Sequence, residues 1–244
     1  MTGRARCSGR RWSAAQCTRW ISGRAAGSMV AGVTESPLTW SLVIPVKVLA
    51  RAKSRLTGLA GPARSALALA MAADTVSAAL ACPAAGAVVV VTDDGEAAGV
   101  LGGLHAVIVP DEPAAGLNPA LAHGAAVAAA RWPAWGVAAL AADLPALRPD
   151  ELDRGLRAAG QWPEAFVADA AGTGTTLYAA RLPAAFRPRF GADSAGRYRR
   201  GGAVEVMLAD VPSLRSDVDT PDDLRQAASL GLGPRTALLA AQLA

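Results

Sequence analysis

Residues 40–46 read WSLVIPV and residues 87–92 read AVVVVT, two short uncharged runs rich in β-branched side chains. Such runs are typical of buried strands. Between them, residues 63–81 (ARSALALAMAADTVSAALA) show apolar side chains at helical spacing, and the following Cys82-Pro83 interrupts a helix. The stretch therefore predicts a strand–helix–strand unit whose first strand is central in a sheet.

The same alternation of strands and helices continues along the chain. The pattern predicts helices at 96–101 and 119–131, strands at 106–109 and 137–142, and a further helix after Pro149. Residues 165–168 and 176–180 are close enough in sequence to pair directly, which predicts one antiparallel strand. We therefore expect an α/β three-layer sandwich with a mostly parallel, mixed sheet, resembling Rossmann-like folds.

Length and charge divide the chain into a leader and one domain. With 244 residues and 52% hydrophobic composition, the chain suits a single α/β domain, which we expect over residues 39–244. Residues 1–28 hold six arginines and no acid, so the net charge of +4 becomes −2 once they are set aside. We expect residues 1–38 to be a disordered leader, with Met29 as an alternative start. The basic charge then gives no reason to expect a nucleic-acid partner.

The composition also indicates the cellular compartment in which the protein resides. No run of eighteen uninterrupted apolar residues occurs, so we expect no membrane span. The three cysteines, Cys7, Cys17 and Cys82, lack metal-ligand spacing and are too scattered for a disulfide framework. These features predict a cytoplasmic protein.

The loop that follows the first strand, residues 47–56 (KVLARAKSRL), carries four cations in nine residues: Lys47, Arg51, Lys53 and Arg55. It contains no glycine, which excludes the glycine-rich phosphate loops of dinucleotide-binding and P-loop proteins. Lys47 and Lys53 are the only lysines in a chain with 22 arginines. The loop is either a solvated basic loop or a set of side-chain cations that bind phosphate.

Two acidic segments follow predicted strands. Asp143 comes at the end of the strand at 137–142, where a carboxylate either starts a turn or holds a divalent cation. In residues 216–224 (SDVDTPDDL), Thr220 to Asp223 are explained as the capped start of a helix. Asp217 and Asp219 lie outside that explanation. We expect them to point to opposite sides of an extended segment, so that one of the two reaches the site, and the sequence leaves open which.

Two small, hydroxyl-bearing segments complete the set, GTGTT at 172–176 and FGADS at 190–194. Each has a structural interpretation, as a hairpin turn and as a helix N-cap. A helix that begins at Asp193 or Ser194 also presents backbone amides suited to a substrate phosphate. Asn118 is interpreted first as a helix N-cap and second as a nucleobase contact. His105 and His123 have no catalytic partner motif and are interpreted as structural.

Together these segments resemble the 2-phospho-L-lactate/phosphoenolpyruvate guanylyltransferase family of coenzyme F-420 biosynthesis. The shared motifs are IPVKxLxxAKSRL at 44–56, DLPAL from Asp143, GTGTT, FGADS and DVDTPDDL from Asp217, over about residues 40–234. The resemblance implies a fold like the nucleotide-diphospho-sugar transferases. It also implies transfer of GMP from GTP to phosphoenolpyruvate or 2-phospho-L-lactate, with pyrophosphate released.

The resemblance further implies roles for particular residues. It gives Asp143 and Asp217, with Asp219 as a candidate, as ligands of Mg²⁺, and Thr175, Gly191 and Ser194 as the site of the phosphorylated acid. We expect two Mg²⁺ ions, with Lys47, Lys53 and Arg55 on the triphosphate. An ionised phosphate needs no general base, in keeping with the absence of a catalytic histidine.

Two alternatives remain from the sequence. One is a molybdopterin or sugar-phosphate nucleotidyltransferase of the same fold, although such enzymes usually open with a glycine-rich loop. The other is a non-catalytic nucleotide-binding domain, because a fold does not prove chemistry. Within the resemblance, the choice of acid and the oligomeric state stay open, and a downstream transferase of the pathway is an expected partner.

Overall fold

The computed structural model describes residues 38–49 and 61–243, which belong to one compact unit, Pro37–Ala244. Apart from Leu38, the leader expected over residues 1–38 lies outside the described residues. Arg51, Lys53 and Arg55 of the basic loop lie outside them as well.

The described unit is built on a seven-stranded sheet with the order β3-β2-β1-β4-β6-β5-β7. Strand β6 runs antiparallel to both of its neighbours, and the other neighbouring pairs are parallel. The strands are β1 (Trp40–Pro45), β2 (Ala85–Val91), β3 (Val107–Val109), β4 (Gly136–Leu140), β5 (Glu164–Ala168), β6 (Thr175–Ala180) and β7 (Val204–Glu205). The mixed, mostly parallel sheet predicted from the sequence is confirmed.

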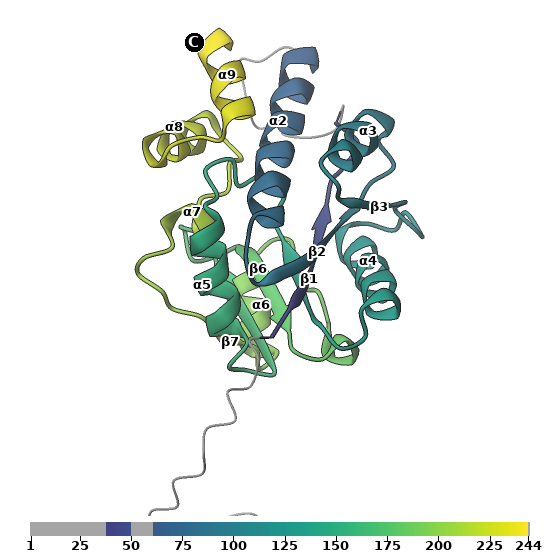
Figure 1. Ribbon diagram of the computed structural model, residues 1–244. Helices are drawn as coiled ribbons and strands as arrows, with labels where there is room; N and C mark the ends of the chain where they lie inside the picture. Colours follow the sequence, from purple (N-terminus) through teal and green to yellow (C-terminus); the bar gives the residue numbers. More distant parts are fainter. Residues whose placement is uncertain (1–37, 50–60, 244) are drawn as a thin grey trace, which may run out of the picture. The chain divides into compact units, whose positions relative to one another are not determined.

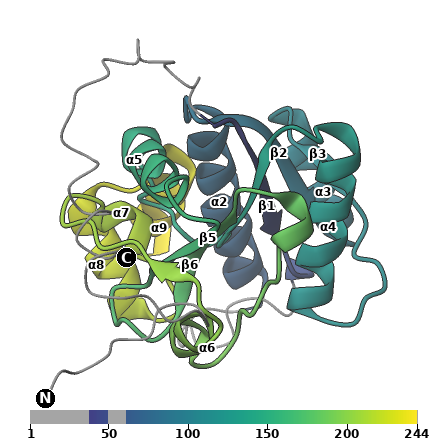
Figure 2. The same ribbon diagram turned by 90° about the horizontal axis from the view of Figure 1, so that it is seen from below.

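Helices cover both faces of this sheet, which gives the three layers that were expected (Figure 1). The helices are α2 (Gly61–Leu80), α3 (Gly95–Gly103), α4 (Leu117–Arg131), α5 (Pro149–Ala159), the 3-10 helix η2 (Pro183–Ala185), α6 (Ser194–Arg200), α7 (Pro212–Arg215), α8 (Pro221–Leu230) and α9 (Pro234–Leu243). Figure 2 shows α2 and α4 on opposite sides of β1.

Alternation along β1 explains how one strand serves both layers. Leu42 and Ile44 are fully buried in the core formed with α2, α3 and α5. Val43 points the other way, into the core formed with α4 and α6. A strand that is apolar on both faces is what a parallel sheet covered on both sides requires. The predicted central position of β1 is therefore confirmed, since it lies between β2 and β4.

Helix α2 has the length and apolar composition of a membrane span. Among the described residues, α2 is one helix that is long and apolar enough to cross a membrane by length and composition alone. Of its most apolar eighteen-residue stretch, 67% is buried inside the fold. Such burial is typical of a core helix, because the apolar side chains of α2 contact the sheet and the C-terminal helices.

The C-terminal helices are anchored on α2 through a buried carboxylate. Asp74 of α2 accepts hydrogen bonds from the backbone nitrogens of Thr236 (2.8 Å) and Arg235 (3.3 Å), at the start of α9. Val218 and Ala227 pack with Leu67 of α2 in the same region. This packing fixes the segment that leads into α8.

Some elements differ from the sequence prediction. The expectation that Asn118 caps its helix is wrong, because α4 begins at Leu117 and its N-cap is Gly116. The capped start of α8 is confirmed, with Thr220 and Asp223 forming a reciprocal capping box. The short elements η2, β7, α7 and the helix α9 were not predicted.

Candidate active site

A cavity of about 700 Å³ opens at the carboxyl edge of the sheet, over the ends of β1 and β4. These two strands lie where the strand order reverses, since β2 and β3 continue on one side of β1 and β4 lies on the other. Loops that follow neighbouring parallel strands diverge at such a point, and ligands bind in the crevice between them. The cavity therefore lies where the fold predicts a ligand site.

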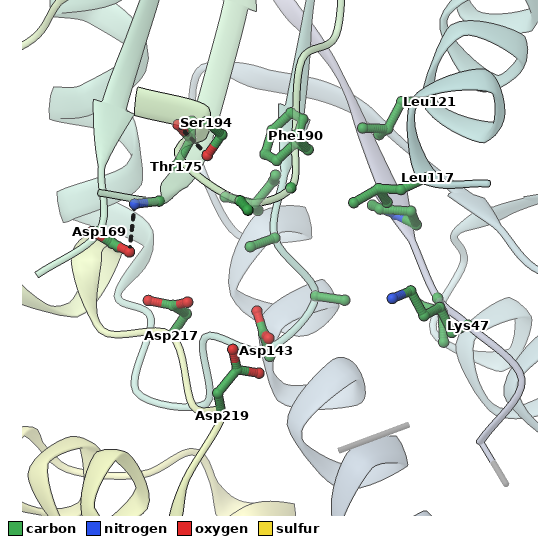
Figure 3. A pocket seen from close by; sticks show the side chains of 18 of the residues that line it. Lys47, Leu117, Leu121, Asp143, Asp169, Thr175, Phe190, Ser194, Asp217 and Asp219 are labelled. Atoms are coloured by element: carbon green, nitrogen blue, oxygen red, sulfur yellow. Dashed lines mark hydrogen bonds between the residues drawn. The ribbon is translucent and has the colours of Figure 1, made fainter. Parts of the chain in front are cut away.

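Lys47 forms one wall of the cavity, directly after β1. Two hydrogen bonds hold its neighbours in place: the backbone nitrogen of Val46 donates to the backbone oxygen of Val91, and the backbone nitrogen of Leu49 donates to Asp94 Oδ2 at 2.9 Å. Asp94 also caps the start of α3. Lys47 is exposed, and its ammonium group points across the cavity toward the opposite wall (Figure 3).

Asp143, Asp217 and Asp219 form that opposite wall (Figure 3). The backbone nitrogen of Val218 donates to the oxygen of Asp143 at 3.0 Å, which joins the two acidic segments. The expectation that Asp217 and Asp219 point to opposite sides is wrong. Residues two apart in an extended segment share a face, so both aspartates line the cavity while Val218 is buried behind them.

A fourth carboxylate, Asp169, also lines the cavity and was not predicted. It follows β5 and accepts hydrogen bonds from the backbone nitrogens of Thr173 (3.0 Å) and Gly174 (2.8 Å). A Cβ at position 174 would collide with this carboxylate, which explains the glycine there. The rule that identified Asp143, an acid at the carboxyl end of a strand, would also have found Asp169.

Thr175, Gly191 and Ser194, the residues predicted for the phosphorylated acid, all line the cavity. Ser194 Oγ donates to Thr175 Oγ1 at 3.1 Å, so the first residues of α6 and β6 are in direct contact. Gly191 has φ +115°, a conformation that side chains strongly disfavour. The predicted start of α6 is confirmed, with Asp193 as the N-cap.

Leu117, Leu121 and Phe190 give the cavity an apolar wall next to Lys47 (Figure 3). Asn118, predicted as a nucleobase contact, is not among the lining residues that the structure describes. Both polar atoms of its side chain instead bind the backbone of Phe190. The structure thus brings together the described residues of the prediction, except for Asn118.

The family profile described as "Guanylyl transferase CofC like" matches residues 40–236 of the chain. This range contains every element of the sheet and every residue of the cavity wall. The chain belongs to this guanylyl transferase family. The resemblance found in the sequence motifs is thereby confirmed, and the chain is a nucleotidyltransferase.

Relatives within the guanylyl transferase family are close. A protein from Thermomonospora curvata named phosphoenolpyruvate guanylyltransferase is 60% identical over 209 residues, covering 86% of this chain and 92% of the relative. One of the same name from Streptomyces coelicolor is 59% identical over 207 residues, covering 84% and 98%. A crystal structure from Desulfovibrio desulfuricans G20, assigned to the nucleotide-diphospho-sugar transferases, superposes with TM-score 0.60 at 18% identity over 83% and 94% of the two chains. That likeness shows the predicted fold.

The carboxylate wall of this guanylyl transferase has an unusual electrostatic state. Burial, followed by the negative charges of Asp143 and Asp169, raises the pKa of Asp217 from 3.8 to about 7. A carboxylate in this environment gains from a nearby cation, which offsets both the desolvation and the repulsion. Lys47, on the wall opposite the carboxylates, is a cation that lines the cavity among the described residues.

The carboxylates fit a hard divalent cation that is partly bound by substrate. Within residues 38–49 and 61–243, no three His, Cys, Asp or Glu side chains converge closely enough to hold an ion on their own. Mg²⁺ usually binds through one or two carboxylates together with substrate phosphates, rather than in an all-protein cage. One or two of Asp143, Asp217 and Asp219, which all line the cavity, would provide such a donor set.

Proposed function

We propose that this guanylyl transferase joins GMP from GTP to phosphoenolpyruvate, releases pyrophosphate and forms enolpyruvoyl-2-diphospho-5'-guanosine for coenzyme F-420 biosynthesis. The names of the relatives at 59% and 60% identity support this choice of acid. 2-Phospho-L-lactate, which would give lactyl-2-diphospho-5'-guanosine, presents a similar phosphate and carboxylate and is the alternative substrate.

The observation that carries the proposal is the polarity of the cavity. A cation, Lys47, faces a wall of carboxylates across one opening, and a pair of hydroxyls at Thr175 and Ser194 lies beside the carboxylates. A binding module for one nucleotide has no need of a carboxylate wall, whereas a transferase must bring two anionic substrates together. The arrangement therefore supports catalysis over simple binding.

The chemistry requires little proton transfer. A phosphate oxygen of the acid forms a bond to the α-phosphorus of GTP, and the bond between that phosphorus and the α–β bridging oxygen breaks as pyrophosphate leaves. The attacking phosphate is already ionised at neutral pH, so no general base is needed. The main task of the protein is to position two repelling anions in line and to balance their charge.

We assign the roles accordingly. Lys47, together with Lys53 and Arg55 of the same loop, binds the triphosphate: the lysines through compact ammonium groups and the arginine through its planar guanidinium. Thr175, Gly191 and Ser194 bind the phosphate of the acid. Asp143, Asp217 and Asp219 would hold Mg²⁺, as two ions, and the bound ions would supply positive charge against the phosphates of both substrates.

The proposal also covers the domain, the compartment and the partners. Residues 39–244 form a single nucleotidyltransferase domain that acts in the cytoplasm, without nucleic-acid or membrane partners, and passes its product to a downstream transferase. A chain that starts at Met29 should keep full turnover. Loss of activity or solubility on this truncation would count against the assignment of residues 1–28 as a dispensable leader.

A pyrophosphate-release assay tests the function. Each of the four common nucleoside triphosphates is combined with phosphoenolpyruvate or 2-phospho-L-lactate in the presence of magnesium. We expect release with GTP and phosphoenolpyruvate, and little without the acid. Release of pyrophosphate with another nucleotide, or without dependence on the acid, would contradict the proposal. A preference for 2-phospho-L-lactate would change only the identity of the acid substrate.

A further inference from the structure

Asn118 connects two parts of the chain that are 72 residues apart. Its Nδ2 donates to the backbone oxygen of Phe190 at 3.1 Å, and its Oδ1 accepts from the backbone nitrogen of Phe190 at 2.7 Å. One amide side chain thus satisfies both polar backbone groups of a single residue. Asn118 is also the only asparagine in the sequence.

The segment that Asn118 holds has no secondary structure of its own. Residues 187–193, all of them described, form neither helix nor strand. Side chains bind the backbone instead. Tyr178 Oη accepts from the nitrogen of Arg187 (3.1 Å), Tyr198 Oη accepts from the nitrogen of Arg189 (2.8 Å), and Arg197 donates to the oxygen of Phe190 (3.3 Å).

The hydrogen bonds to this segment come from two different parts of the fold. Tyr178 belongs to β6, while Tyr198 and Arg197 belong to α6, so all three lie on the side of the cavity that carries Thr175 and Ser194. Asn118 belongs to the first turn of α4, which packs against β1, β2 and β4. Its contact therefore ties the segment before Gly191 to the part of the fold that carries Lys47.

We propose that Asn118 is a positioning residue: it sets the place of the Phe190–Ser194 segment, and hence of the phosphorylated acid, relative to the nucleotide. The inference rests on the proposed function of Gly191 and Ser194. In-line transfer demands accurate placement of the attacking oxygen, and a misplacement of about 1 Å costs on the order of a hundredfold in rate. A contact between α4 and this segment supplies this accuracy without touching either substrate.

The geometry distinguishes this role from base recognition. An amide side chain has one acceptor and one donor group, and in Asn118 each is directed at Phe190. The apolar side chains of Leu117 and Phe190 face the cavity, whereas Asn118 is not among its lining residues. To pair with a nucleobase through this same donor–acceptor edge, Asn118 would have to give up both bonds to Phe190.

The test compares Asn118→Ala and Asn118→Asp with the wild type. Alanine removes both bonds, while aspartate keeps the acceptor and places an oxygen against the Phe190 carbonyl. Gln161→Ala is the matched control, because it removes an amide-to-backbone bond, Gln161 Nε2 to Arg157 oxygen, away from the cavity. The measurements are kcat/KM for the acid, the Kd of GTP without acid, nucleotide preference and thermal stability.

We expect kcat/KM for phosphoenolpyruvate to fall by about tenfold to a hundredfold in both Asn118 variants. The Kd of GTP should stay within about twofold of wild type, and preference for GTP should not change, since no base contact is lost. Gln161→Ala should match the wild type throughout. Weakened GTP binding or relaxed nucleotide preference would instead show base recognition and overturn the proposal. Unchanged kinetics would overturn it too, as would unfolding of both variants with the control intact.

A second readout does not depend on turnover. Hydrogen exchange followed by mass spectrometry should show faster exchange of the backbone amides around Phe190 in Asn118→Ala, and no change there in Gln161→Ala. Equal exchange in all three proteins would overturn the positioning role. If the wild type released no pyrophosphate, the proposed function would fail, and the exchange result would still decide whether Asn118 holds this segment.

Discussion

Asp217 lies beside Asp143 in the cavity wall, and burial together with the charge of Asp143 raises the pKa of Asp217 to about 7. The backbone bond from Val218 to Asp143 fixes this relationship, because it joins the two segments at the residue next to Asp217. The fold thus holds carboxylates together at a cost in electrostatic energy. Strongly shifted pKa values of this kind cluster at functional sites.

This pKa predicts how stability depends on pH without magnesium. Between the ordinary value of 3.8 and the folded value of about 7, the folded protein keeps a proton that the unfolded chain has lost. The stabilising contribution that proton binding by Asp217 makes to the free energy of unfolding is therefore complete below about pH 4. It is lost as pH rises to about 7. Thermal melts should show Asp217→Asn more stable than wild type above about pH 7, and the difference should shrink toward about pH 4. A difference that is independent of pH would contradict the raised pKa.

Magnesium should reverse this loss. A cation competes with the proton on Asp217, so magnesium should raise the melting temperature of the wild type more at about pH 8 than at about pH 6. Asp217→Asn should show a smaller magnesium effect with little pH dependence. Equal magnesium effects in both proteins at both pH values would remove Asp217 from the cation site.

Asp143→Asn should leave the fold intact and remove most of the activity. The amide keeps the shape of the side chain but deletes the anionic oxygen that a hard cation prefers. Asp150→Asn is a suitable control, since Asp150 is an exposed partner of Arg154 on α5. Circular dichroism and turnover at saturating magnesium measure the two effects. Wild-type turnover in Asp143→Asn would exclude this carboxylate from the mechanism.

Lys47→Ala should lose a charge-assisted hydrogen bond to the triphosphate, on the order of 1.5–3 kcal/mol, or roughly tenfold to 150-fold in kcat/KM for GTP. Lys47→Arg keeps the charge but changes the shape of the donor, so we expect a clear but smaller loss. Lys53→Ala and Lys53→Arg should behave in the same way. Arg181→Ala, on an exposed arginine after β6, serves as the control for loss of one surface charge. Full activity in both Lys47 variants would identify it as a solvated surface lysine.

The sequence predicted the central sheet because the strands are buried on both faces and carry continuous apolar runs. It missed short or late elements for a physical reason: β7 has two residues and α7 has four, too few for any periodicity. Helix α9 depends on Asp74, a contact across 162 residues to Thr236 that local patterns do not contain.

For the cavity, position after a strand was sufficient to predict that Asp143 and Lys47 line it. The orientation of Asp217 and Asp219 was predicted wrongly, although the two-residue repeat of extended chain gives their common side. The contact between Asn118 and Phe190 could not be predicted, because it depends on how α4 packs against a segment without secondary structure.

Phosphorus NMR of one reaction mixture tests the central claim most directly. Wild-type protein, magnesium, GTP and phosphoenolpyruvate are combined, and Asp143→Asn is run beside it. The account predicts that the phosphoenolpyruvate signal disappears in step with GTP, replaced by one pyrophosphate and one coupled pair of diphosphate-ester signals per turnover, with little change in the variant over the same time. Pyrophosphate formed while the phosphoenolpyruvate signal persists would mean that water, not the acid, attacks GTP, and would contradict the account.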